Sequence, residues 1–166
     1  LEARLKDVTG IGIEAMRLGT GQFHLLATRR LLPFFLVQFL GAVNDNIYKN
    51  ALVILIAYRD TSSSTATQIV VTIAAALFIL PYFLFSATAG QLADKFHKTA
   101  LVRLVKLWEI GVMVLASLSF TVSSVPFQLA ILFFLGVQSA FFGPVKYGIL
   151  PELLPAEELM GGNALI

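Results

Sequence analysis

The sequence predicts an all-α bundle of membrane-spanning helices, and three observations support this fold class. Hydrophobic residues make up 57% of the 166 residues and charged residues only 13%, whereas an average soluble domain carries about 25% charged residues. Long apolar stretches approach or exceed the roughly 20 residues that a helix needs to cross a bilayer. Polar, turn-forming segments separate these stretches, as expected for consecutive spans.

The predicted spans follow one another from residue 31 onward. They cover residues 31–58, 69–89, 101–122 and 127–149. A fifth helix is expected to begin near Leu159. Pro81 and Pro144 fall inside the second and fourth spans, where a membrane helix tolerates a proline kink if neighbouring groups satisfy the freed carbonyls. The chain is therefore expected to hold four helices and the start of a fifth.

Basic residues predict the orientation of these spans. One side of the bilayer receives Arg4, Lys6, Arg17, Arg29, Arg30, Lys95, Lys98, Arg103, Lys106 and Lys146, and the other side only Arg59. By the positive-inside rule the N-terminus is cytoplasmic. Glycines in residues 1–28 weaken any helix there, so we expect a cytoplasmic tail over 1–28 and a membrane domain over 29–166.

Composition argues against several function classes. The net charge of +2 gives no strong attraction to nucleic acid, and the absence of Cys excludes disulfides and thiolate metal sites. Membrane acyltransferases usually carry His-x-x-x-x-Asp, but Arg29 stands five positions after His24 and Val102 five after His97. We find no Ser/His/Asp set, and neither His is expected to bind a metal. The sequence therefore predicts no enzyme activity, no cofactor and no metal site.

Polar residues in the middle of the first span are the most informative feature of the chain. Asn44, Asp45, Asn46 and Lys49 lie inside an apolar run, and Gln38, Asp45 and Lys49 share one stripe of a helix. Ionisable groups within a membrane are costly unless they face protein or a water-filled cavity. This span is therefore expected to line a transport pathway, since the helices of a simple anchor would lack such central charge.

Asp45 and Lys49 leave two roles open. Their i,i+4 spacing allows an internal ion pair that neutralises itself and locks the helix. Alternatively, Asp45 binds a coupling cation or the amine of a zwitterionic substrate. The two roles are compatible if cation binding breaks the pair, because occupancy would then be coupled to conformation.

Ionisable residues also occur in the third and fourth spans. Glu109 follows Lys106 by three residues, and we expect a salt bridge near the lipid headgroups, with proton coupling as the alternative. Gln138 and Lys146 share a face of the fourth span. Lys146 either extends its ammonium to the membrane surface or contacts a phosphate.

The segment between the second and third spans carries a spaced motif of glycine and charged residues. It reads Gly90-x-x-x-Asp94-Lys95-x-x-Lys98, in which Gly90 would allow close helix approach and Asp94 would cap a short helix. The spacing and position resemble the signature of the major facilitator superfamily, although that family usually has Gly where His97 stands. The resemblance implies a structural gate between conformational states rather than a substrate site.

Two further segments narrow the resemblance. Gln38-Phe-Leu-Gly-Ala-Val-Asn-Asp-Asn46, with Lys49 and Asn50, and Phe142-Gly-Pro-Val-Lys-Tyr147 resemble the bacterial lysophospholipid transporter branch of that superfamily. The likeness covers residues 29–166. It implies twelve helices in two halves that move lysophospholipids across the bacterial inner membrane. It also implies a cation or headgroup site at Asp45 and a phosphate contact at Lys146.

The resemblance sets expectations about partners and about competence. The bilayer, the remaining helices of a full-length transporter and a lysophospholipid substrate are the implied partners. Some relatives are fused to an acyltransferase and acyl-carrier-protein synthetase. Alternating access requires two repeats around a central site, so four helices are not expected to transport alone. The alternatives are efflux of small amphipathic drugs on the same scaffold, or a membrane module of an acyltransferase fusion.

Overall fold

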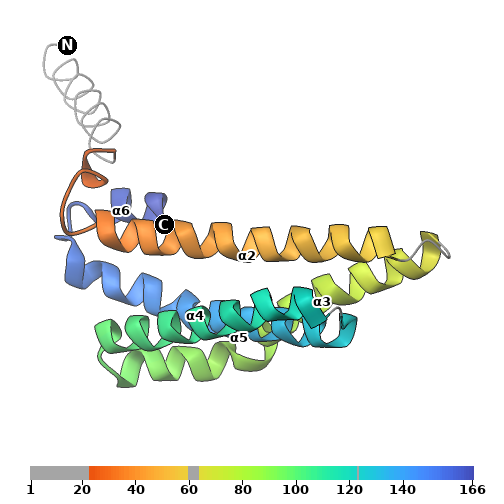
Figure 1. Cartoon of the computed structure of the whole chain (residues 1–166). Helices are drawn as coiled ribbons and strands as arrows, with labels where there is room; N and C mark the ends of the chain where they lie inside the picture. Colours follow the sequence, from red (N-terminus) through yellow and green to blue (C-terminus); the bar gives the residue numbers. More distant parts are fainter. Residues whose placement is uncertain (1–22, 60–63, 123) are drawn as a thin grey trace, which may run out of the picture. The chain divides into compact units, whose positions relative to one another are not determined.

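A computed structural model of the chain describes residues 23–59, 64–122 and 124–166, and no strand occurs among them (Figure 1). The long helices and one short helix are α2 (Leu32–Arg59), α3 (Ser64–Lys95), α4 (Lys98–Val122), α5 (Val125–Leu153) and α6 (Leu159–Leu165). All four predicted spans are confirmed as helices, as is the start of a fifth. Most of the tail predicted for residues 1–28 lies outside the described residues.

The second predicted span was too short at both ends. α3 begins five residues before residue 69 and continues six residues past residue 89. The helix runs through Pro81 without interruption. The helical backbone hydrogen bonds continue into polar residues at both ends. A prediction based on runs of apolar residues does not detect these extensions. Most of the gate motif is therefore the last turns of α3 rather than a loop.

The described chain forms two compact units. One contains the chain up to Leu40 together with Leu150–Ile166, and the other contains Gly41–Ile149. In the first unit, Thr28 caps the start of α2, because its hydroxyl oxygen accepts a hydrogen bond from the Leu31 amide at 3.3 Å. Also in this unit, a side chain on Gly162 would collide with Leu154, so the glycine permits α6 to pack closely.

The second unit has an apolar core to which all four long helices contribute. Its buried members are Tyr48, Leu52, Ile56, Ala74, Val112, Ala116, Ile131, Leu132 and Leu135. The Tyr48 hydroxyl donates a hydrogen bond to the backbone carbonyl of Gln128 at 3.0 Å. A buried tyrosine needs such a partner for its polar end. This core holds one end of the helices in fixed register and so positions the polar residues nearby.

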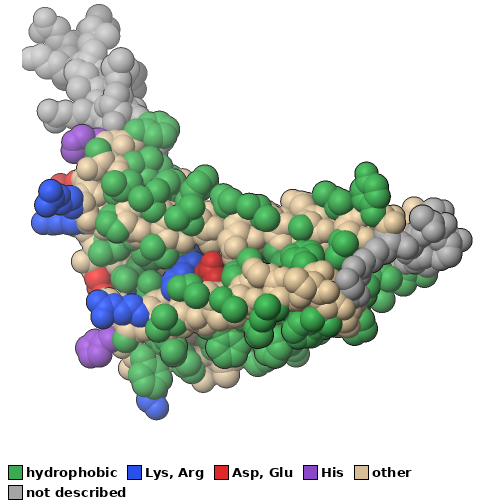
Figure 2. Space-filling view, in the orientation of Figure 1, with side chains coloured by type: hydrophobic (Ala, Val, Ile, Leu, Met, Phe, Trp, Pro, Cys, Tyr) green, Lys and Arg blue, Asp and Glu red, His purple; other side chains and the backbone are tan. Residues whose placement is uncertain are grey.

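Large hydrophobic side chains also cover much of the outside. Phe83 is 80% exposed, Leu107 66% and Ile110 62%, and Figure 2 shows hydrophobic side chains across the visible face. By length and composition, two helices can cross a membrane, over Thr67–Lys95 and Val125–Leu153. α2 and α4 have 28 and 25 residues, which is also sufficient length, but they carry the charged residues of the site described next.

Candidate functional site

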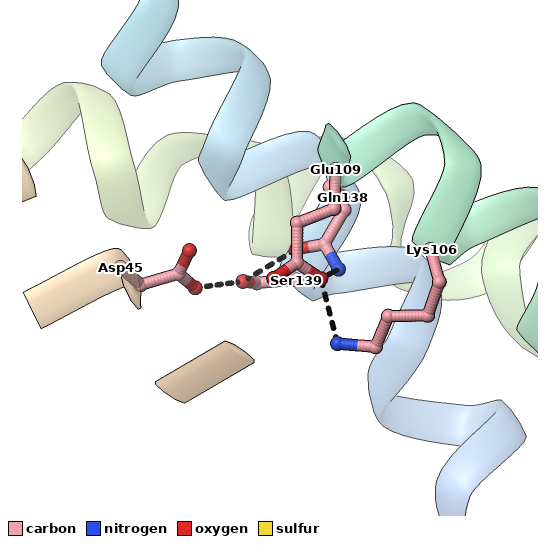
Figure 3. A network of polar contacts seen from close by, with 5 residues as sticks. All are labelled: Asp45, Lys106, Glu109, Gln138 and Ser139. Carbon is pink, nitrogen blue, oxygen red and sulfur yellow. Dashed lines mark hydrogen bonds and ion pairs between the residues drawn. The ribbon is translucent and has the colours of Figure 1, made fainter. Parts of the chain in front are cut away.

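A network of polar side chains joins three helices of the second unit (Figure 3). Its members are Asp45 on α2, Lys106 and Glu109 on α4, and Gln138 and Ser139 on α5. Three of the five side chains carry charge, and Gln138 and Ser139 each donate a hydrogen bond to one of the carboxylates. Ionisable groups inside a membrane bundle are costly, so this network is the candidate functional site.

Glu109 is the centre of the network. Its Oε2 lies 2.6 Å from Lys106 Nζ and accepts a hydrogen bond from Gln138 Nε2 at 2.7 Å. The predicted Lys106–Glu109 salt bridge is therefore formed. Its expected position near the headgroups stays a prediction; Glu109 is buried in the bundle and lies eleven residues after Lys98, the first residue of α4. That is about 16 Å along a helix.

Asp45 reaches the network through Ser139. Ser139 Oγ donates to Asp45 Oδ2 at 2.8 Å and also lies 3.2 Å from Gln138 Oε1. A hydroxyl carries one proton, so it serves one of these acceptors at a time. The other carboxylate oxygen, Asp45 Oδ1, is buried and has no hydrogen-bond partner among the described residues. One acceptor of the Asp45 carboxylate is therefore not satisfied by any described residue.

The predicted ion pair between Asp45 and Lys49 is not formed between these two described residues. Lys49 Nζ instead lies 4.3 Å from the centroid of the Phe78 ring on α3. Residues four apart on a helix differ by about 40° around its axis. That difference directs Asp45 towards α5 and Lys49 towards α3, so each side chain finds its partner on a different neighbouring helix.

Lys106 lies in an enclosure built from three sides. Besides Glu109, its ammonium faces the Phe142 ring, 4.4 Å from the centroid. On α2, a Cβ added to Gly41 would stand 2.5 Å from Lys106 Nζ and 3.1 Å from Glu109 Oε1. The missing side chain of Gly41 therefore leaves the space that the ion pair occupies. A carboxylate together with an aromatic face is the combination that recognises alkylammonium groups.

The structure gathers only two of the predicted substrate or ion residues into the network, Asp45 and Gln138. Asn46 is exposed and donates to the Ala42 carbonyl of its own helix. Asn44 is half-buried, and its Nδ2 has no partner among the described residues. Gln38 belongs to the first unit, where its Nε2 donates to the Ile166 carbonyl.

Lys146 lies on α5, next to Tyr147 in the sequence. Its ammonium lies 4.8 Å from the centroid of the neighbouring Tyr147 ring, and the side chain is half-buried. The phosphate contact suggested for Lys146 therefore stays a prediction.

Two expectations for the gate motif are wrong in this structure. No described atom outside the helix's own backbone lies within 4 Å of a Cβ built on Gly90, so this glycine is not required by close helix packing. Asp94 is exposed and accepts no hydrogen bond from the described residues. It occupies the last turn of α3, where free carbonyls rather than free amides are present. Lys95 is exposed, and the stem of Lys98 lies against Gly148 on α5.

Sequence reasoning did not place Lys106, Glu109 or Ser139 among the candidate binding residues. Lys106 and Glu109 were interpreted as a surface pair, and Ser139 carries no charge. The available signal was the polar dipeptide Gln138-Ser139 in the middle of an apolar helix. Two adjacent polar residues on a helix point about 100° apart, so they can meet two different neighbouring helices, as they do here.

The charges of the network do not cancel. Lys106 and Glu109 neutralise each other, whereas Asp45 has no ion-pair partner among the described residues. Within the part of the chain that the structure describes, no group of three or more metal-ligating side chains is present. The uncompensated Asp45 carboxylate is suited to receiving a single positive charge, or the ammonium of a larger ligand.

Comparison with known proteins identifies the family. Residues 31–165 match the family described as transmembrane secretion effector, of the major facilitator superfamily. The lysophospholipid transporter LplT of Salmonella arizonae is 28% identical over 144 residues, covering 85% of this chain and 33% of the relative. The LplT of Citrobacter koseri is 30% identical over 142 residues, covering 84% and 32%.

The chain spans about a third of the length of these relatives. No solved structure matches it significantly. The family match covers every helix described above and includes the whole network from Asp45 to Ser139. The chain therefore belongs to the transmembrane secretion effector family of the major facilitator superfamily.

Proposed function

We propose that the full-length protein moves lysophospholipids across the bacterial inner membrane by alternating access, with a cytoplasmic N-terminus. The observation that carries this proposal is the similarity to relatives named lysophospholipid transporter LplT over about 85% of the chain. The buried network supports it, because a zwitterionic headgroup needs polar partners inside the bundle while its acyl chain needs an apolar surface. The protein is proposed to act as a transporter and not as an enzyme.

Roles for individual residues follow from this proposal. Asp45 would take a coupling cation or the amine of the headgroup, supported by its uncompensated charge and its unoccupied Oδ1. The remaining candidates around the pathway are Gln38, Asn44, Asn46, Lys49, Gln138 and Lys146. Gly90, Asp94, Lys95 and Lys98 would form the gate. An acyltransferase with an acyl-carrier-protein synthetase is the proposed enzymatic partner, since it would consume the delivered lipid.

The direct test reconstitutes the full-length protein in proteoliposomes and measures movement of labelled lysophosphatidylethanolamine between leaflets. Transport above protein-free vesicles is expected. This chain alone, reconstituted in the same way, should give none, because a single set of helices cannot rock against a second repeat. Absence of lipid movement by the full-length protein would refute the proposal.

The Asp45→Asn variant should lose transport at least tenfold while expression and folding are retained. The amide preserves shape and the hydrogen bond from Ser139, but it removes the negative charge that would attract a cation. The initial transport rate is the measurement. Glu157→Gln, an exposed site near α6, is the matched control and should transport normally. An unchanged rate for Asp45→Asn would assign the carboxylate to packing.

A second candidate is export of small amphipathic molecules. The family description as a secretion effector favours it, because secretion is outward movement. Competition separates the two proposals. Displacement of a bound fluorescent amphipath by drugs, with no displacement by lysophosphatidylethanolamine, would favour export. Displacement by the lipid supports the first proposal.

A further inference from the structure

We propose that Glu109 and Lys106 form a binding site for a zwitterionic phospho-amine headgroup, in which the ligand's ammonium replaces Lys106 at Glu109 and its phosphate pairs with the released Lys106. This inference rests on the proposed function, because it names the part of the network that selects the headgroup. It assigns the amine to Glu109 rather than to Asp45. Asp45 is then left for a coupling cation.

The surroundings of Lys106 carry the argument. Its ammonium contacts a buried carboxylate at 2.6 Å and faces the Phe142 ring at 4.4 Å. Gln138 holds the same carboxylate oxygen at 2.7 Å. A carboxylate beside an aromatic ring is suited to binding an alkylammonium group, and here the Lys106 ammonium occupies that position. The Lys106 side chain thus occupies a site that could bind the ammonium group of a ligand.

Exchange of partners explains why a zwitterion is the fitting ligand. Separating a buried ion pair leaves two uncompensated charges, which is strongly unfavourable. A ligand that carries only an ammonium or only a phosphate would satisfy one of the two and strand the other. A phospho-amine headgroup satisfies both at once, so Lys106 and Glu109 exchange one partner each with no charge left alone.

An apolar pocket beside the ion pair provides room for an acyl chain. The pocket, about 320 Å³, is lined by Leu104, Val105, Trp108, Phe141 and Gln138, among others. Gln138 lines this apolar pocket with its carbon atoms, and its Nε2 donates to Glu109. One residue therefore borders both the headgroup site and the pocket. The combination matches an amphipath with a charged head and an alkyl tail.

Movement of Lys106 is compatible with the packing around it. Gly41 presents only backbone to the ammonium, and the Lys106 side chain retains 18% exposure. The flexible four-carbon stem of a lysine lets its ammonium shift while the helix stays in place. Glu109, by contrast, is held by Gln138. The lysine is therefore the mobile member and the carboxylate the fixed one.

The test compares two lysolipids of equal acyl chain in the full-length protein. Lysophosphatidylethanolamine carries ammonium and phosphate, and lysophosphatidylglycerol carries phosphate alone. Glu109→Gln should raise the KM for the ethanolamine lipid at least tenfold and leave the KM for the glycerol lipid unchanged or lower, because Lys106 becomes free for phosphate. Lys106→Gln should weaken the glycerol lipid most. Arg103→Gln, exposed one turn earlier on α4, is the matched control and should change neither KM.

A double variant keeps the inference falsifiable if a lone buried charge prevents folding. Lys106→Gln with Glu109→Gln leaves no unpaired charge, and it should transport both lipids with equal KM. An ethanolamine preference that survives in this variant would overturn the inference, as would an equal loss for both lipids in Glu109→Gln.

Binding separates this inference from the transport proposal. Trp108 is the only tryptophan of the chain and lines the pocket, so its fluorescence, taken as the difference from Trp108→Phe, reports lipid binding directly. Headgroup-selective binding without lipid movement would refute transport and retain the site. Lipid movement with no headgroup selectivity in either assay would refute the site and retain transport.

Discussion

At the residue scale, the central feature is the single proton of Ser139. It is shared between the Asp45 carboxylate at 2.8 Å and the Gln138 carbonyl oxygen at 3.2 Å. A cation bound to Asp45 would neutralise the carboxylate and so weaken the hydrogen bond that it accepts from Ser139. Ser139 can then donate to the Gln138 carbonyl oxygen, and Gln138 in turn donates a hydrogen bond to Glu109. Binding of a cation at Asp45 on α2 would therefore change the hydrogen bonding of Glu109 on α4, through Ser139 and Gln138 on α5.

Replacing Ser139 tests this connection. Ser139→Ala removes the donor to Asp45 and should destabilise the protein by about 0.5–2 kcal/mol. It should also reduce the dependence of transport on the coupling cation. Thermal unfolding in detergent and a cation titration of the transport rate measure the two effects.

The matched control for Ser139→Ala is Ser117→Ala. Ser117 is exposed and bonds only to the Met113 carbonyl of its own helix, at 3.0 Å. Its removal should leave both stability and cation dependence close to wild type. If the two variants behave alike, Ser139 has no role in linking the helices.

At the element scale, α3 and α5 approach each other at Gly136. A side chain there would collide with the Phe78 carbonyl and stand 3.0 Å from Pro81 Cγ. Backbone and a rigid proline ring cannot yield as a flexible side chain can. The glycine therefore sets the distance between these two helices, and with it the placement of Gln138 and Ser139, two and three residues further along α5.

Gly136→Ala should destabilise the second unit by about 1–3 kcal/mol, the usual effect of overpacking a tight contact. The unfolding midpoint in detergent is the measurement. Gly143→Ala on the same helix is the control, because no atom of the described residues outside the helix's own backbone lies within 4 Å of its added Cβ. A gain in helix propensity of up to about 1 kcal/mol should leave that variant as stable as wild type or more so. An equal loss of stability in both variants would show that the substitution disturbed the helix itself rather than the contact of Gly136 with α3.

At the scale of the whole molecule, the distribution of basic residues predicts how the helices are inserted. Lys95, Lys98 and Arg103 surround the α3–α4 connection, so this end is expected in the cytoplasm. The connection between α2 and α3 then faces outward. The chain has no cysteine, which makes single introduced thiols readable in a cysteine-free background.

Thr65→Cys and His97→Cys, both at exposed positions, should label differently in intact inner-membrane vesicles or cells. A membrane-impermeant maleimide applied from the periplasmic side should modify position 65 directly and position 97 only after permeabilisation. Labelling of both sites in permeabilised membranes shows that both thiols react. The reverse pattern in intact membranes would contradict the orientation and the direction of the gate.

The positions of the helices could be predicted because they depend on local properties. Runs of apolar residues predicted the ends of the long helices to within six residues, and the polar stretch around Asp45 already indicated a buried site. The same reasoning failed at Asp94 and Gly90, because it treated a segment as a loop that the backbone continues as helix. The run of apolar side chains ends before the hydrogen-bonded helix does.

Sequence alone thus determined the helical class, the approximate positions of the helices, the family and the presence of charged residues within otherwise apolar helices. Tertiary structure decided which charges meet: Lys49 turns to Phe78, Glu109 collects Lys106 and Gln138, and Asp45 depends on Ser139. The reason is geometric. Spacing along one helix fixes which residues share its face, but the rotation of each helix against its neighbours sets their partners, and that rotation follows from packing contacts such as Gly136 and Gly41.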